Sequence, residues 1–318
     1  EASEIDTVLR HTEYVLTRES SWQAWHSINR AERRHRKKQA EKAARNFAIR
    51  NNSGTMTNIP PDQDNASLEA QLNDAVEHHR AGRLFEAEEI YRRILAVDPD
   101  HSFALCLLGT IAQAVGENEQ AVDLIGRAIS IKPDYTDAYI NLSVVFMAMD
   151  RFEEALAGFE QAVALNPDFA EAHSNKGVAL MKLERPDEAV ESYRRAIEIR
   201  PEHTEAHFNL GNALKEMERP EDAIASYREA IALQPGHAGA HHNLGKVLRD
   251  LGQLDDAVES YRRSIEIRPD YAEAHDNLGT VLRNLGRLDL SVTNHRKAID
   301  INPDMDAAHN NLGLALQE

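Results

Sequence analysis

Apolar and small residues return every 34 positions from Leu68 to the end of the chain, and within each period they keep a helical spacing. If Leu68 is position 1, then positions 4, 7, 8 and 11 of every period lie on one face of a helix. Position 32 of seven successive periods is proline, without one insertion or deletion: Pro99, Pro133, Pro167, Pro201, Pro235, Pro269 and Pro303. A fixed period of this length predicts stacked helical hairpins.

Small residues recur at two places in the period. Position 8 is Ala75, Gly109, Ser143, Gly177, Gly211, Gly245, Gly279 and Gly313, and position 20 is Ala87, Ala121, Ala155, Ala189, Ala223, Ala257 and Ser291. Position 24 supplies bulk: Tyr91, Ile125, Phe159, Tyr193, Tyr227 and Tyr261. We expect the small residues to let the two helices of a hairpin approach closely, so that a larger side chain at Gly211 would cost about 1–3 kcal/mol.

The proline at position 32 predicts the end of each second helix, because it has no N–H to donate and disfavours helical geometry in the residue before it. Acidic residues follow it at the expected start of the next helix, as in Pro167-Asp168 with Glu171 and Pro269-Asp270 with Glu273. Negative charge there agrees with the helix dipole.

These positions together resemble the tetratricopeptide repeat: small at 8, large apolar at 11, Ala at 20, Tyr or Phe at 24, Ala at 27 and Pro at 32. The resemblance covers Leu68 to Glu318, which is seven whole repeats and the first helix of an eighth. It implies an all-α, right-handed superhelical solenoid of antiparallel helix pairs. Such a solenoid presents a concave surface that is suited to binding another polypeptide.

The first helices also carry a narrower resemblance. Glu205-Ala-His-Phe-Asn-Leu-Gly211 and Glu273-Ala-His-Asp-Asn-Leu-Gly279, with similar runs in the other late repeats, look like the repeats of protein O-GlcNAc transferases. In that family a ladder of asparagines along the inner surface grips the substrate polypeptide. The resemblance implies that the chain could be the substrate-recognition arm of such a glycosyltransferase, with a catalytic domain beyond residue 318.

The asparagines are also unusual on physical grounds. Asn is a mediocre helix former, yet position 6, which we expect to face the groove, is Asn in seven of eight first helices. An amide has two donors and one acceptor, so it can pair with the backbone of an extended chain whatever that chain's sequence. The predicted ladder is Asn73, Asn141, Asn175, Asn209, Asn243, Asn277 and Asn311. The alternatives are inheritance from one ancestral repeat and hydrogen bonds to a neighbouring repeat.

Positions 5, 9 and 12 should flank the ladder, and their character changes along the chain. They are mainly apolar in the early repeats, with Cys106, Ile140, Val144, Met147, Val178 and Met181, and later become Phe208, Asn212, Lys215, His242, Lys246, Arg249 and Arg283. We expect Met147, Met181, Phe208, Lys215, Lys246, Arg249 and Arg283 to tune selectivity for a ligand with hydrophobic and acidic residues. The alternative is that the cations simply solvate an exposed face.

Charge is uneven along the chain of 318 residues. The formal net charge is −17, but residues 1–55 carry 11 basic and 7 acidic residues, which leaves −21 on the remainder. Nucleic acid is therefore an unfavourable partner for the repeats. The sequence has no run of apolar residues that could span a membrane and no secretory signal, and its single cysteine allows no internal disulfide, so we expect a cytoplasmic protein.

No catalytic motif is present: there is no P-loop, nucleophile elbow, zinc-protease signature or dinucleotide fingerprint. We therefore predict a binding protein without a cofactor. Histidines recur at position 4, which we place on the core side, but repeat stacking holds them too far apart for one metal ion. We also place Cys106 in the groove, as an apolar contact rather than a nucleophile.

Three segments are predicted. Residues 1–50 form a basic, helix-compatible segment with Trp22 and Trp25, residues 51–67 form a flexible linker, and residues 68–318 form the solenoid. Both ends look cut, because the chain begins without methionine and the eighth period never reaches its proline. A scaffold whose groove takes the N-terminal segment of another copy is a further alternative, which would make the protein a homo-oligomer.

Overall fold

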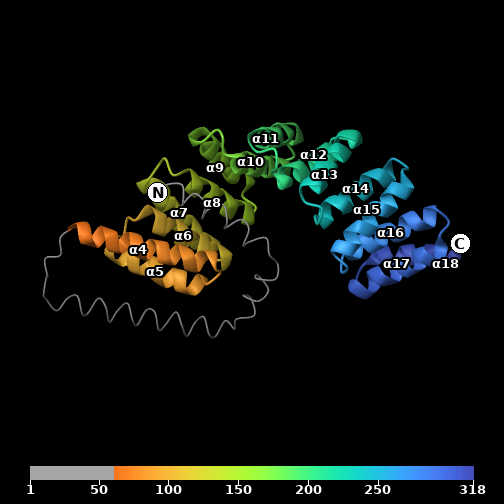
Figure 1. Ribbon diagram of the computed structural model, residues 1–318, viewed down its shortest axis with the longest axis horizontal. Coiled ribbons are helices and arrows are strands. Elements are labelled where there is room, and N and C mark those ends of the chain that lie inside the picture. Colours follow the sequence, from red (N-terminus) through yellow and green to blue (C-terminus); the bar gives the residue numbers. More distant parts are fainter. Residues whose placement is uncertain (1–60) are drawn as a thin grey trace. The chain divides into compact units, whose positions relative to one another are not determined.

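The computed structural model describes residues 61–318, with side chains from Ser67 onward. This range contains fifteen α-helices and no strand, which confirms the predicted all-α helical-repeat solenoid (Figure 1). The predicted N-terminal segment, residues 1–50, lies outside the described residues, as does the linker up to residue 60.

The helices alternate between a first and a second helix of each 34-residue period. The first helices are α4 (Pro61–Arg80), α6 (Ser102–Ala114), α8 (Thr136–Ala148), α10 (Ala170–Lys182), α12 (Thr204–Glu216), α14 (Ala238–Asp250), α16 (Ala272–Asn284) and α18 (Asp306–Gln317). The second helices are α5 (Leu84–Val97), α7 (Asn118–Ile131), α9 (Phe152–Leu165), α11 (Pro186–Ile199), α13 (Pro220–Leu233), α15 (Leu254–Ile267) and α17 (Leu288–Ile301).

The helix boundaries repeat with the sequence period. From α6 onward every first helix begins at position 1, and every second helix runs from position 17 to position 30. The first helix of the series is different, because α4 begins at Pro61 rather than Leu68. The last part of the predicted linker is therefore helical, since proline is favoured in the first turn of a helix and Asp62 follows it.

Each hairpin closes around the small residue at position 8. A Cβ atom added to Gly177 would lie 2.6 Å from the Tyr193 ring, and one added to Gly245 would lie 2.9 Å from the Tyr261 ring. The alanines at position 20 are fully buried on the opposing helix. The close approach predicted from the pattern is thus confirmed in each hairpin for which these contacts are described.

Helix ends follow the predicted proline signal. Asp98, which precedes Pro99, has an extended backbone at φ −123° and ψ 91°, and it ends α5. The turn inside each hairpin requires a left-handed residue at position 15. Glycine fills that place at Gly82, Gly116, Gly252 and Gly286, whereas Asp150, Glu184 and Glu218 occupy it with φ between 56° and 58°.

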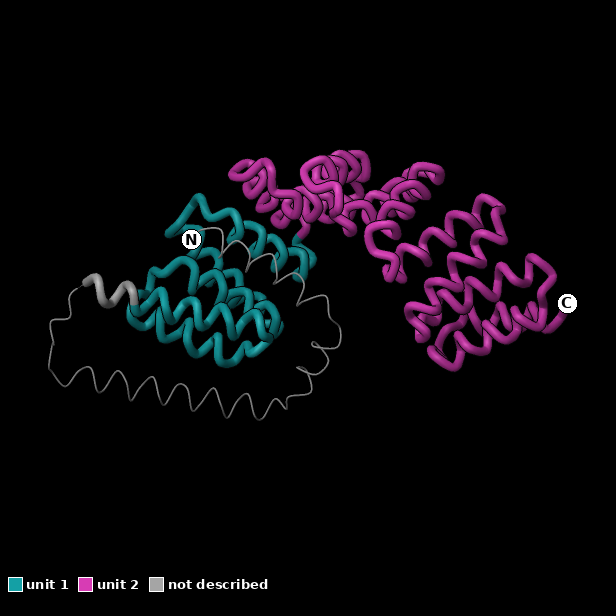
Figure 2. Tube along the Cα trace, in the orientation of Figure 1, with its two compact units in different colours: residues 1–151 teal, residues 152–318 magenta. Residues whose placement is uncertain are grey.

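The contacts divide the chain into two compact units, Glu1–Arg151 and Phe152–Glu318 (Figure 2). In the described part of the first unit, α4–α8 enclose Tyr91, Ile94 and Leu105, which are buried almost completely. In the second unit, α9 packs on α10, α10–α17 form successive hairpins, and α18 packs on α17. Their core contains Phe159, Tyr193, Tyr227, Tyr261, Leu180, Leu248 and Leu282. One buried ring or branched side chain per repeat makes a continuous core within each unit.

Candidate functional site

The position-6 asparagines lie at the same place on their first helices, and we call the surface that Asn175, Asn209, Asn243, Asn277 and Asn311 mark in the second unit the asparagine face. Asn73 on α4 is exposed. The other six are half-buried: Asn141, Asn175, Asn209, Asn243, Asn277 and Asn311. Half-burial leaves part of each amide accessible and brings the rest against the neighbouring repeat.

Several of these amides donate a hydrogen bond to the preceding repeat. Asn277 Nδ2 donates to His242 Nε2 at 3.0 Å, and Asn243 Nδ2 donates to Asn212 Oδ1 at 2.8 Å. In the first unit, Asn141 Nδ2 donates to the Cys106 sulfur at 3.4 Å. The alternative considered from the sequence, a bond to the neighbouring repeat, therefore holds for these members of the ladder.

Asn209 differs from those members. Its side chain is half-buried on α12, and among the described residues it has no hydrogen-bond partner. The preceding repeat carries Ser174 at position 5, which is buried but does not bond to it. The amide of Asn209 thus keeps two donors and one acceptor for another molecule.

Position 5 is buried in most repeats, contrary to the sequence-based placement in the groove, whereas Phe208 is half-buried and Asn310 is exposed. Cys106 is fully buried, and Ile140 and His242 are 7% and 6% exposed. The next repeat covers this position with its own position-6 side chain and, in places, with the ring at position 34. Burial raises the pKa of Cys106 to about 12, so the thiol stays protonated.

His242 is a buried connector between two repeats. Since Asn277 donates to Nε2, the proton of the ring sits on Nδ1, which donates to the Tyr271 hydroxyl oxygen at 3.1 Å. The two rings are also in contact, tilted by 45° with centroids 4.7 Å apart. Burial, followed by the charges of Lys246 and other cations, lowers the pKa of His242 to about 4. The ring is therefore neutral and adds no charge to the asparagine face.

The predicted cations lie close to the asparagine face and are all half-buried: Lys215 on α12, Lys246 and Arg249 on α14, and Arg283 on α16. The guanidinium of Arg249 is paired within the protein, because it donates to Asp250 Oδ1 at 2.8 Å and to Asn277 Oδ1 at 3.1 Å. Lys246 has a lowered pKa, first because it is partly desolvated and then because Lys215 and Arg249 repel its charge. Lys215, Lys246 and Arg249 are therefore close enough for their positive charges to interact.

The predicted apolar contacts are half-buried as well. Phe208 on α12 packs on the His237 ring with centroids 4.7 Å apart, and on Tyr227 at 6.0 Å. Met147 belongs to the first unit and Met181 to the second. Each methionine is partly accessible at position 12 of its own first helix.

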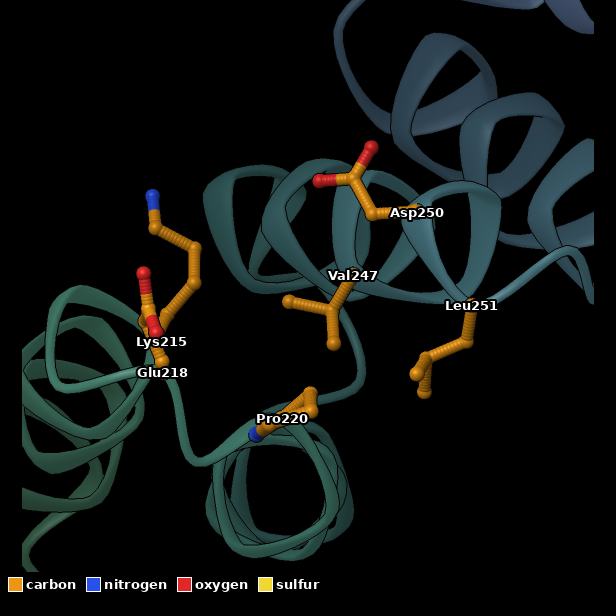
Figure 3. Close-up of a pocket in the computed structure, with 6 residues that line it drawn as sticks. All are labelled: Lys215, Glu218, Pro220, Val247, Asp250 and Leu251. Atoms are coloured by element: carbon orange, nitrogen blue, oxygen red, sulfur yellow. The ribbon is translucent and has the colours of Figure 1, made fainter.

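A cavity of about 280 Å³ lies beside Lys215 of the fifth repeat (Figure 3). Lys215 and Glu218 stand on one wall, and Val247 and Asp250 of α14, with Leu251 just after it, line the other. Pro220 completes the apolar floor between them. Ligand sites for small molecules usually measure 300–1,000 Å³, so this cavity lies near the lower end of that range.

The position-4 histidines, predicted on the core side, differ in burial. His275 of α16 is buried, those of α10, α12 and α14 are half-buried, and that of α18 is exposed. Each Nε2 bonds at 2.9–3.2 Å to the carbonyl of the proline that ends the preceding helix: His173, His207, His241, His275 and His309. The recurring His and Pro pair, six residues apart, was the available sequence signal. No group of residues suited to hold a metal ion occurs in the described part of the chain.

Histidines also cap the N-termini of several first helices, a role that the sequence reasoning missed. The ring Nδ1 of His237 accepts the backbone N–H of Ala240 at 3.0 Å, and His101 and His203 do the same in their repeats. Their side chains satisfy N–H groups that the first turn leaves unpaired. Position 34 was not considered as a helix cap, because Ser, Thr, Asp and Asn are the usual capping residues.

The seventh repeat contains a buried polar network, which the sequence reasoning also missed. His295 replaces the aromatic residue of position 24 and is fully buried, with Nδ1 2.7 Å from Asp276 Oδ1. Asn311 Nδ2 lies 3.1 Å from both oxygens of Asp276. The signal was the joint departure of positions 24 and 5 from the other repeats. This network connects α16, α17 and α18.

Comparison with known families identifies the repeats. A family model described as TPR repeat matches residues 245–286 and 279–318, and models described as tetratricopeptide repeat match residues 140–204, 204–237 and 226–259. Together these matches run without a gap over more than half of the chain. The protein therefore belongs to the tetratricopeptide repeat family, whose members are protein–protein interaction modules. A comparison with curated protein sequences gave no match.

Solved structures agree with this assignment. YrrB, described as a TPR protein with an unusual peptide-binding site, has 25% identity and a TM-score of 0.50, with 59% of this chain and 97% of that chain covered. PilF of Pseudomonas aeruginosa has 20% identity and a TM-score of 0.60, with coverages of 67% and 97%. PilW, a type IV pilus biogenesis factor, has 21% identity and a TM-score of 0.61, with coverages of 66% and 98%. The last two show the fold alone.

No helix among the described residues is long and apolar enough to cross a membrane.

Proposed function

We propose that the asparagine face binds an extended polypeptide segment of a partner protein. The observation that carries the proposal is the Asn209 side chain, a half-buried amide without a partner in the middle of a row of asparagines. Neighbouring members of the row are held by bonds between repeats, so they are already oriented before a ligand arrives. A fixed row of amides can pair with successive peptide groups at a low cost in side-chain entropy.

The surroundings support the same proposal. A peptide backbone offers a donor and an acceptor at each residue, which matches a carboxamide whatever the peptide's side chains. The half-buried Phe208 and Met181 offer apolar contacts for alternate side chains, and the cavity beside Lys215 accepts one more. YrrB, to which the chain is similar, is described as having a peptide-binding site.

The proposal is tested by selecting binders from a random dodecapeptide library on the full chain and measuring their affinity by fluorescence anisotropy. Asn209→Ala should weaken the selected peptides about tenfold, as expected for the loss of one or two hydrogen bonds of about 0.5–1.5 kcal/mol each. Its melting temperature should stay unchanged, because no internal bond is lost. Asn118→Ala is the matched control, since Asn118 is half-buried on the second helix α7.

Two further results separate binding from folding. Asn277→Ala should lower the stability of the protein, because the variant removes the donor to His242 and the acceptor of Arg249. Peptide affinity of this variant is therefore measured at a temperature at which its melting curve shows that it is folded. Equal peptide affinity in the wild type and in Asn209→Ala, or no peptide selected at all, would show that the asparagine face is not the binding surface.

A further inference from the structure

Cations of the described region fall into two groups according to burial and pairing. Most half-buried cations have a partner inside the protein: Arg200 lies 2.7 Å from Glu171, Lys176 lies 3.4 Å from Glu160, and Arg249 binds Asp250. Lys132 and Arg151 lie over aromatic rings. Among the described residues, three half-buried cations have no such partner: Lys215, Lys246 and Arg283.

These three unpaired cations occur on consecutive first helices, α12, α14 and α16, at positions 12, 9 and 12. The chain carries 53 acidic residues against 36 basic ones, so an unpaired cation is not explained by a shortage of carboxylates. Partial burial of an uncompensated charge costs free energy, which an anionic group of another molecule would recover. The lowered pKa of Lys246 reflects the same cost.

From this juxtaposition we infer that Lys215, Lys246 and Arg283 bind carboxylate side chains of the polypeptide ligand. The inference rests on the proposed function, since it names the ligand class for the same face. The cavity beside Lys215 also carries the carboxylates of Glu218 and Asp250, so the ligand side chain that it would take beside Pro220, Val247 and Leu251 is an apolar one (Figure 3). Arg249 has a supporting role, because Asp250 and Asn277 hold its guanidinium in place beside Lys246.

The spacing of the helices gives the spacing of the acidic residues. The first helix α14 contacts both α12 and α16. Helices in contact lie about 8–10 Å apart, and an extended chain advances about 3.3 Å per residue, so one repeat corresponds to roughly three ligand residues. The preferred ligand therefore carries Asp or Glu at every third position, in register with α12, α14 and α16. Contiguous acidic residues would bring like charges together and reach fewer of the three cations.

Three fluorescein-labelled dodecapeptides test the inference by anisotropy on the full chain. The first has Glu at positions 3, 6 and 9 among Ser, Thr and Gly, the second has the same composition with the three Glu contiguous, and the third has Gln in place of Glu. The spaced acidic peptide should bind at least tenfold more tightly than the Gln peptide, and its affinity should fall as salt is raised. The contiguous peptide should lie between them.

Variants locate the site. The triple variant K215Q/K246Q/R283Q should lose the preference for Glu over Gln while keeping its melting temperature, because no internal ion pair is removed. The matched control R194Q/R228Q/R262Q removes three charges from exposed positions on the second helices α11, α13 and α15, and it should keep the preference. An equal loss of the Glu preference in both triple variants would mean that only the net charge of the protein matters. That result would overturn the proposed carboxylate site.

The remaining outcomes distinguish the two proposals. If the Gln peptide binds as tightly as the spaced Glu peptide and Asn209→Ala weakens both, the polypeptide face stands and the carboxylate site is wrong. If the contiguous peptide binds as tightly as the spaced one, the three-residue register is wrong. If none of the peptides binds the wild type, the proposed function fails and the carboxylate site fails with it.

Discussion

Gly211 on α12 lies against the face of Tyr227 on α13, so closely that a Cβ atom on the glycine would stand 2.6 Å from a ring carbon. The hydroxyl of Tyr227 donates to Asn212 Oδ1 at 2.8 Å, and the same oxygen accepts from Asn243 of the next repeat. This close contact inside one hairpin is thus connected to the asparagine face. Hairpin packing and the orientation of a ladder side chain depend on each other in this repeat.

Gly211→Ala should destabilise the protein by about 1–3 kcal/mol, because the methyl group has no room unless Tyr227 moves. Urea unfolding followed by circular dichroism measures the change. The control is Gly313→Ala, the same repeat position on α18, where nothing lies within 4 Å of the added Cβ. That variant should gain about 0.5–1 kcal/mol, since alanine is the better helix former. Equal effects at both sites would contradict the packing argument.

Glu184→Gly should stabilise the protein by about 0.5–1 kcal/mol. Glu184 has φ 58°, a conformation that costs a residue with a Cβ about 1–2 kcal/mol. Glycine removes this strain, but its unfolded chain has more conformational entropy, which offsets part of the gain in stability. The reciprocal change, Gly252→Ala at φ 75°, should destabilise by a similar amount. Thermal unfolding of both variants checks the pair, and stabilisation by Gly252→Ala would refute the strain.

Asp276→Ser should cost about 2–4 kcal/mol, because it leaves the buried His295 and the Asn311 amide without their acceptor. The double variant D276S/H295Y should recover most of this loss. It recreates the fourth repeat, where Ser174 and Tyr193 occupy the same positions opposite a glycine. The four proteins of this double-mutant cycle are compared by urea unfolding, and an additive result would show that the two side chains are not coupled.

The stability of the wild type should fall as the pH drops from about 6.5 towards 4, partly through His242. The pKa of His242 is about 4 in the folded protein against an ordinary value of 6.5, so in this window the unfolded chain binds a proton that the folded protein does not. The contribution is complete above about pH 6.5 and is lost with a slope of up to about 1.4 kcal/mol per pH unit. His242→Gln should unfold with a smaller pH slope, and an unchanged slope would exclude this origin.

Local interactions made the repeat predictable from sequence. Glycine at position 8 and proline at position 32 act through backbone geometry and close packing within one hairpin, which the 34-residue period records directly. The register of helix starts, the ends before each proline and the contact between Gly211 and Tyr227 therefore follow from the order of residues.

Contacts between neighbouring repeats could not be predicted from the 34-residue pattern. A helical wheel places Cys106 and His242 on the side away from the core. It describes one helix alone and does not include the next hairpin, which buries both residues. Likewise it gives every position-6 asparagine the same environment. Only the stacking of neighbouring repeats gives Asn277 a bond to His242, leaves Asn209 without one, and leaves Lys215 half-buried without a carboxylate, because each outcome depends on which side chain the adjacent repeat presents.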